Sequence, residues 1–427
     1  MNILKLSVRL FFPALCCFAL SVEAGTAAEN IEVAHARLFR EFVRPEGLLC
    51  DYVGEMPTPK DCAEGRPNAI GWMSPIENGP MFTGPYLKAC LQRARRLRGT
   101  PRFEQALKEC AHLAAGLIHA ASVSDVKGMV VRGVGTDGKC HYPIGSEDQT
   151  LPWFFGLHAY ATSAFVPAAE RAKARAKMKE VADAIEANNM DCPCDGRFRK
   201  HISGSFRYGS LPFRFASHTL FFFAAMHEVT GEEKWQKHYL ACRDTRNKQF
   251  GKTGVEMCEE GWESDKKDFK VEQYGVWIYV AAQGCMAELL RLEKNPAIVA
   301  RYRRGLLYNA ERAKLCGLMD RASKYDNRME RPFRFANWRT GYAWRDQATE
   351  RDAREVVNTG DAKILGHRRE HERDFMTLPL SCAAVCGYAG RYRAEIERTI
   401  ACYDFNEVNL CEFFLAEVAW EAVHAAK

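Results

Sequence analysis

The feature that most constrains the fold is a regular alternation between two kinds of predicted helix. Four helical segments carry almost no charge: 150–169, 215–226, 274–287 and 375–390. The helical segments between them are rich in Lys, Arg and Glu: 168–188, 232–248 and 296–315. A helix that is apolar on every side is buried, whereas a charged amphipathic helix covers a surface. The alternation therefore predicts an all-α fold with an inner and an outer layer of helices.

The predicted helices are joined by connections of two lengths. We expect about twelve helices, at 30–44, 79–98, 101–121, 148–165, 167–189, 212–229, 231–247, 273–293, 296–315, 368–388, 391–402 and 409–424. Short turns marked by Gly or Pro lead outward from the charge-poor helices. Long loops lead back inward, at 45–78, 122–147, 190–211, 248–272 and 316–367. If the helices form antiparallel hairpins, the long loops emerge at one end and form a rim. Segment 128–134 is the one candidate for a short strand.

This arrangement resembles the six-hairpin, (α/α)6-toroid carbohydrate-active enzymes, which include unsaturated glucuronyl hydrolases, other glycoside hydrolases and some polysaccharide lyases. The resemblance is one of helix arrangement. It extends over nearly the whole mature chain and rests on no sequence motif. It implies a toroid of about twelve antiparallel helices and an oligo- or polysaccharide substrate bound at the loop rim. The same toroid occurs in epimerases, so the fold alone does not determine the reaction.

The N-terminus is typical of a secretory signal peptide. Lys5 and Arg9 precede an apolar run at 10–20, and small residues follow near position 24. We therefore expect a signal peptide at 1–24, a single toroid domain at 25–427 and an exported protein. The apolar run is too short to span a bilayer, and no other segment is predicted to do so. The formal net charge of +6 is mild and gives no reason to expect a nucleic-acid partner; the oligomeric state stays open.

The cysteines are compatible with disulfides in an exported protein. The full chain has 17 cysteines, two of them inside the predicted signal peptide. Cys50 with Cys62, or Cys192 and Cys194 with other loop cysteines, are candidate pairs, and the pairing stays open. The Cys192–Cys194 spacing does not fit a zinc knuckle, and no second pair completes a tetrahedral site. We expect neither a metal nor a cofactor.

The rim carries acidic residues suited to glycoside hydrolysis, which uses two carboxyl groups that flank the scissile bond. Asp148 follows the loop that precedes one inner helix, and Glu77 precedes another. These two form the predicted catalytic pair. Other acids on rim loops remain alternatives: Asp51, Asp137, Asp195, Glu256, Glu259 and Asp326. One group of the pair must stay protonated near neutral pH, through burial or a neighbouring carboxylate.

Further rim residues have types suited to catalysis or sugar binding. His141 and Tyr142 are candidate catalytic groups beside Asp148. The candidate substrate-binding residues offer aromatic faces or polar groups: Trp72, Trp153, Gln149, Arg132, Arg207, Tyr208 and Trp262. The segment 146–149 also fits a helix capping box, with Ser146 as the N-cap and Gln149 reaching back, which explains it without function. His158 and His218 lie within inner helices and are expected to be core histidines.

These residues predict a secreted glycoside hydrolase that acts on a uronate-containing or otherwise anionic glycan. A polysaccharide lyase is the first alternative, because elimination needs a Tyr or His base and a neutralised carboxylate. The residues with suitable types are His141, Tyr142, His201, Arg207 and Tyr208. A non-catalytic glycan-binding toroid is the second alternative, and it predicts that the rim acids are used in caps and salt bridges.

Overall fold

The computed structural model is mostly helical, and the part of the chain that it describes contains isolated β-bridges but no strand. It describes residues 26–66, 68–71, 74–209, 211–262, 277–315, 338–339, 344–347, 349, 351–353 and 389–424. The all-α prediction is confirmed for these residues. The short strand considered at 128–134 is wrong, because its backbone bonds to helix ends; Val131 N donates to Ala120 O.

The helices follow the predicted order with small shifts at their ends. Their bounds are α1 Ala27–Arg37, η1 Leu38–Phe42 (a π-helical turn), α2 Pro59–Ala63, α3 Gly79–Arg96, α4 Phe103–Ala120, α5 Glu147–Thr162, α6 Ala168–Ala187, α7 Pro212–Thr230, α8 Glu233–Asp244, α9 Gly254–Glu260, α11 Trp277–Leu292, α12 Pro296–Leu315, α17 Arg393–Ala401 and α18 Phe414–His424. Short 3-10 turns are η2 Gly196–Phe198, η5 Trp344–Asp346, η8 Ala389–Tyr392 and η9 Cys411–Phe413. The short helices α2 and α9 were not predicted. The inner helix predicted at 368–388 lies outside the described residues.

The charge-poor helices are buried and the charge-rich ones are not. Every side chain of α5 from 149 to 158 is buried, whereas α6 buries only Ala174, Met178, Val181, Ala182 and Ile185. The pair α7 and α8 repeats this difference, since α8 buries only Trp235 and Tyr239. An inner and an outer set of helices is therefore present in the described part of the chain.

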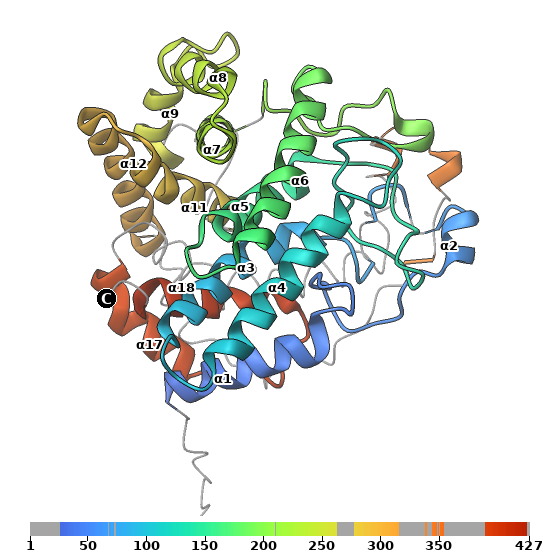
Figure 1. Ribbon diagram of the computed structural model, residues 1–427, viewed down its shortest axis with the longest axis horizontal. Helices are drawn as coiled ribbons and strands as arrows, with labels where there is room; N and C mark the ends of the chain where they lie inside the picture. The colour runs from blue at the N-terminus through green and yellow to red at the C-terminus, as the bar shows by residue number, and fades with distance from the viewer. Residues whose placement is uncertain are drawn as a thin grey trace, which may run out of the picture.

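The inner helices pack against one another in sequence order. α3 contacts α18 on one side and α5 on the other, α5 contacts α7, and α7 contacts α11 (Figure 1). α4 packs on α3, and the charge-rich helices α6, α8 and α12 pack on α5, α7 and α11. Each of the inner helices α3, α5, α7 and α11 is thus covered by the outer helix that follows it, as the short turns require.

Two glycines allow α3 and α5 to approach closely. A Cβ atom on Gly84 would lie 1.9 Å from Pro152 O, and one on Gly156 would lie 2.7 Å from Gly84 Cα. Real Cβ atoms do not make such contacts, so any side chain here forces the two helices apart. This close packing fixes the N-terminal ends of both helices side by side, where the loop rim begins.

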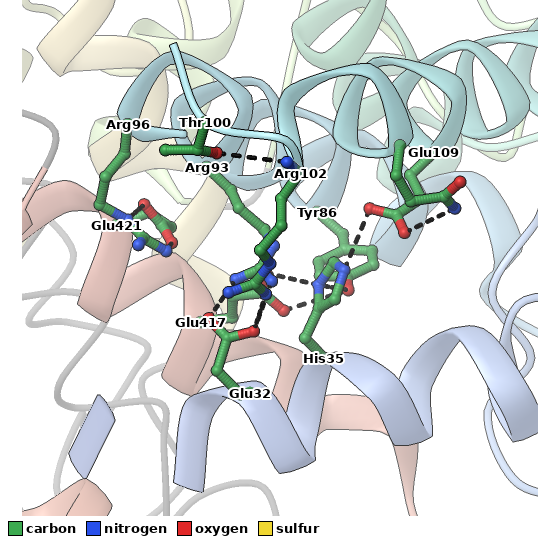
Figure 2. Close-up of polar contacts among 11 residues, drawn as sticks. Glu32, His35, Tyr86, Arg93, Arg96, Thr100, Arg102, Glu109, Glu417 and Glu421 are labelled. Atoms are coloured by element: carbon green, nitrogen blue, oxygen red, sulfur yellow. Dashed lines mark hydrogen bonds and ion pairs between the residues drawn. The ribbon is translucent and has the colours of Figure 1, made fainter. Parts of the chain in front are cut away.

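A buried polar network joins the beginning of the chain to its end (Figure 2). His35 on α1 contacts Glu417 on α18 at 2.8 Å and Glu109 on α4 at 3.1 Å. Tyr86 on α3 donates to the other oxygen of Glu417 at 3.1 Å. Arg96 on α3 pairs with Glu421 on α18. Because four helices share these contacts, the network holds the first and last helices on α3.

No helix in the described ranges is both long and apolar enough to cross a membrane. The predicted signal peptide at 1–24 lies outside those ranges.

Candidate functional site

Three long loops meet at one end of the helices and form the rim. The loops span residues 43–78, 121–146 and 188–211, of which residues 67, 72, 73 and 210 are not described. Figure 1 shows α2 and the loops after α4 and α6 together on the right. Ser124 Oγ donates to Asp195 Oδ2 at 2.8 Å, and Thr136 N donates to Pro57 O at 2.9 Å. The predicted shared rim is therefore confirmed for these three loops. The other two predicted rim loops lie mostly outside the described residues.

The segments that carry Glu77 and Asp148 lie next to each other on this rim. Gln149 Nε2 donates to Asn78 Oδ1 at 3.1 Å, and these residues directly follow the two acids in sequence. Arg132 reaches both segments, since its guanidinium contacts Ser146 Oγ at 3.2 Å and the Glu77 carbonyl oxygen at 3.5 Å. The first turns of α3 and α5 are thus tied together by side chains from the rim.

These contacts replace the predicted capping box at the start of α5. Ser146 is the N-cap residue, but its side chain makes no capping hydrogen bond. Its hydroxyl accepts from Arg132, and Gln149 bonds to α3 at Asn78 and Met81. The capping-box prediction is wrong because these partners come from distant parts of the chain.

A cluster of four charged or titratable side chains lies across the first turns of α5 and α7. Arg214 on α7 pairs with Asp148 and, at 2.8 Å, with Glu147 Oε2. The other oxygen of Glu147 bonds His218 Nδ1. Arg214 therefore bridges the two neighbouring carboxylates, and Glu147 bridges Arg214 to the imidazole.

The protonation states in this cluster follow from burial and from the Arg214 charge. Burial works against ionising Glu147 and Asp148, but Arg214 outweighs it and lowers the pKa of both carboxyls. Burial is the largest effect on His218 and lowers its pKa, against the attraction of Glu147. A neutral imidazole that donates from Nδ1 to a carboxylate carries its lone pair on Nε2.

That second nitrogen of His218 is unusual. Nε2 is buried and has no hydrogen-bond partner among the described residues. His218 lines a narrow cavity of about 30 Å³ together with Glu147, Ser205, Tyr208, Arg214 and Thr219, which we call the helix-end cavity. A space of this size admits water but not a sugar ring. The arrangement, a carboxylate that orients a neutral imidazole, is suited to general-base chemistry.

A larger open cavity of about 580 Å³ lies elsewhere on the rim. We call it the loop cavity; its lining includes Cys62, Lys139, Cys140, His141, Arg197 and Arg345. His141 Nε2 bonds Asp195 Oδ2 at 2.8 Å, and its Nδ1 contacts Lys139 O at 2.7 Å. Burial opposes the charged form of His141, but Asp195 and the Lys139 carbonyl prevail and raise its pKa. The lining also contains two carboxylates, Asp137 and Asp195, so its cationic groups outnumber its acids only modestly.

Several predicted site residues are too buried to contact a sugar. Tyr142 is 1 % exposed, and its hydroxyl donates to Ser74 Oγ at 2.6 Å. Trp153 is 0 % exposed, and its indole donates to Leu117 O at 2.6 Å. Trp262 is 2 % exposed. The predicted stacking and catalytic roles of these three are therefore corrected, since their aromatic rings are buried inside the protein.

The two polar candidates near them join chain segments. Gln149 is 0 % and Arg132 is 4 % exposed, and both make the interloop contacts described above. They are positioning residues of the rim, which corrects their predicted contact with substrate.

Two candidates keep an exposed side chain, and one cannot be placed. Tyr208 is 44 % exposed and lines the helix-end cavity. Arg207 pairs with Asp191 at 2.6 Å and lies over the Tyr208 ring. Its charge is thus matched by a rim acid. Trp72 lies outside the described residues.

The structure brings together a different pair of cysteines from the predicted one, and its described residues include a group of possible metal ligands. Cys50 is buried, and Cys62 lies beside Cys140, so the candidate Cys50–Cys62 pair is not the one that the fold brings together. Among the described residues, His35, Cys90 and Glu417 have ligand atoms within 4.8 Å of one another. Both nitrogens of His35 already bond carboxylates in the buried network, which explains this group as structural.

The residue that sequence reasoning missed is His218. It was expected to be a core histidine, and it is indeed buried, but it also lines the helix-end cavity on the rim. The signal was its position in the second turn of an inner helix, close to the end where the long loops emerge. Arg214 lies one turn earlier on α7, and Glu147 lies beside Asp148. Their positions at the same ends of the inner helices could also have indicated that they lie near His218.

Comparison with known protein families, curated proteins and solved structures found no match to this chain.

Proposed function

We propose that this protein is a glycoside hydrolase that acts on a uronate-containing or otherwise anionic glycan, with its site on the rim and export through the signal peptide at 1–24. We also propose that the helices close into an (α/α)6 toroid. The sequential packing of α18, α3, α5, α7 and α11 supports a ring of inner helices. The predicted helix at 368–388 would supply the sixth.

The observation that carries the proposal is the His218 site. In our mechanism the Nε2 lone pair of His218 accepts a proton from a water molecule in the helix-end cavity. That water attacks the anomeric carbon of a sugar that lies outside this cavity, against the exposed side of Tyr208. Glu147 holds the imidazole through Nδ1 and stabilises the imidazolium that forms. Arg214 keeps Glu147 ionised and in position, against its burial and the neighbouring Asp148 carboxylate, which both disfavour its charge.

Hydrolysis also needs a group that protonates the leaving oxygen. The lowered pKa of Asp148 argues against that role for it, which leaves Glu77 as the proton donor of the predicted pair. The Glu77 side chain is buried, at 4 % exposed, and burial of this kind favours the protonated form that a proton donor needs. We expect Glu77→Gln to reduce the rate on natural glycosides by about 10²-fold or more. Aryl glycosides with a good leaving group need no protonation and serve as the control; equal losses on both substrate types would contradict this role.

The anionic substrate class is supported by the cations of the loop cavity. Lys139, Arg197 and Arg345 line this cavity and outnumber its two acids, Asp137 and Asp195. The raised pKa of His141 adds further positive charge. Arginine and lysine side chains in such a cavity favour carboxylate or sulfate groups. Exposed Tyr208 offers a face on which a sugar ring can stack.

The experiment that tests the function is a screen of neutral, uronate-containing and sulfated glycans with the purified protein. New reducing ends without an ultraviolet-absorbing product would support hydrolysis. We expect release from anionic substrates and none from neutral ones. Binding without any cleavage would contradict the proposal and favour the non-catalytic glycan-binding alternative, which the many paired rim acids also fit.

A polysaccharide lyase remains the second candidate, and the same neutral imidazole favours it. A lyase base removes the proton at C5 of a uronate and leaves a double bond in the product. Digestion accompanied by ultraviolet absorbance of the unsaturated sugar would assign His218 to elimination and reject hydrolysis. The small volume beside His218 is the observation that favours water as its partner.

A further inference from the structure

Two cysteines far apart in sequence come together at the wall of the loop cavity. Cys62 lies on α2 and Cys140 lies in the loop before α5, and both line the cavity. The two thiols lie close enough that each shifts the pKa of the other. Both are partly exposed and free, so an oxidant in solution can reach them.

The backbone around the pair is already fixed from both sides. The loop contacts the segment before α2, since Thr136 N donates to Pro57 O at 2.9 Å, and it closes on itself, since Gly135 N donates to Cys140 O at 2.8 Å. α2 begins with a capping box in which Thr58 and Asp61 exchange hydrogen bonds. The two thiols are therefore held together by structure that does not depend on a covalent link.

From this juxtaposition we propose that Cys62 and Cys140 form a redox-active dithiol, which closes to a disulfide across the wall of the loop cavity. The inference does not depend on the proposed hydrolysis.

The two sulfurs have different roles in the exchange. The hydrogen bond from Cys140 is the largest effect on Cys62 and lowers its pKa, and nearby His141 acts in the same direction. The pKa of Cys140 is raised, chiefly by the neighbouring Cys62 and by burial. Cys62 is thus the better thiolate and the attacking nucleophile.

The reaction balances with a small-molecule disulfide as the oxidant. The Cys62 thiolate attacks one sulfur of that disulfide, forms a mixed disulfide and releases one thiolate. The Cys140 sulfur then attacks Cys62 Sγ and releases the second thiolate, and the Cys140 proton goes to a released thiolate. Two electrons pass from the protein to the oxidant, which leaves as one thiol and one thiolate; the thiolate then takes up from the solvent the proton that Cys62 had lost.

The test uses glutathione and glutathione disulfide in defined ratios. After equilibration and alkylation, trypsin separates the two cysteines into peptides 61–88 (the Arg66–Pro67 bond is not cleaved) and 140–171, each of which contains one cysteine. We expect these peptides to be linked, with the loss of two hydrogens, under oxidising ratios and separate under reducing ones. Both cysteines alkylated under excess oxidant, or Cys62 linked to Cys50, would overturn the proposal.

A second readout is thermal stability. A disulfide between Cys62 and Cys140 closes a long loop of the unfolded chain. We expect this to raise the unfolding midpoint of the oxidised protein by about 5 °C. Cys62→Ser and Cys140→Ser should each abolish this shift. Cys402→Ser, at an exposed cysteine elsewhere, should keep it. A shift that survives in Cys62→Ser would assign the effect to another pair and overturn the proposal.

Discussion

At the residue scale, the central point is that His218 and Glu147 form a pair on neighbouring helices. The sequence placed acids, a histidine and arginines on one rim, but it did not show which of them meet. The predicted pair Asp148 and Glu77 lies on adjoining segments, yet Asp148 is paired with Arg214. That pairing depends on the packing of α7 on α5, which no local pattern in the sequence reports.

The His218 assignment predicts the acid side of the pH–activity profile. Burial lowers the pKa of His218 from its usual 6.5, so the imidazole is neutral, and able to accept a proton, at pH values above that. We expect kcat/KM to stay constant as the pH falls to about 6.5 and to drop only below it. An acid limb that begins well above pH 7 would contradict a lowered pKa at the base.

At the element scale, the order of the helices and the inner or outer place of each could be predicted, because burial on all sides and charge follow directly from composition along the chain. The sequence did not predict which aromatic side chains are buried. Trp153 looked like a rim residue because it lies in the first turns of α5, but its ring turns toward α4 and bonds Leu117. Side-chain direction at a helix end depends on neighbouring helices.

The contact of α3 with α5 predicts an unusual sensitivity to a single methyl group. Gly84→Ala places a Cβ atom against Pro152 O, and we expect the free energy of unfolding to fall by about 3 kcal/mol. Gly99→Ala is the control: Gly99 has nothing within 4 Å but a φ of +84°, so strain alone should cost about 1 kcal/mol. Denaturant unfolding measures both, and equal losses would argue against the close approach.

At the scale of the whole molecule, α1 and α18 meet on α3 through buried ionisable groups (Figure 2). Burial is the largest effect on His35 and disfavours its charge, but Glu417 and Glu109 together raise its pKa to about 9. The folded protein therefore holds the proton more tightly than the unfolded chain does.

This network predicts a loss of stability at alkaline pH. Because the folded pKa of His35 lies above its unfolded value of about 6.5, its contribution is complete below that value and disappears as the pH rises through about 9. The contribution is about 3 kcal/mol. We expect the stability difference between the wild type and His35→Gln to shrink by about this amount from about pH 6 to about pH 10. A difference that is constant with pH would contradict a charged His35.

The most direct test of the account is the rate of glycan cleavage by His218→Gln relative to wild type, measured on the best anionic substrate of the screen. Glutamine keeps the size and polarity of the side chain but cannot accept the proton. The account predicts a loss of about 10² to 10⁴-fold in kcat with an unchanged fold, checked by circular dichroism. A folded variant with at least half of the wild-type rate would contradict it.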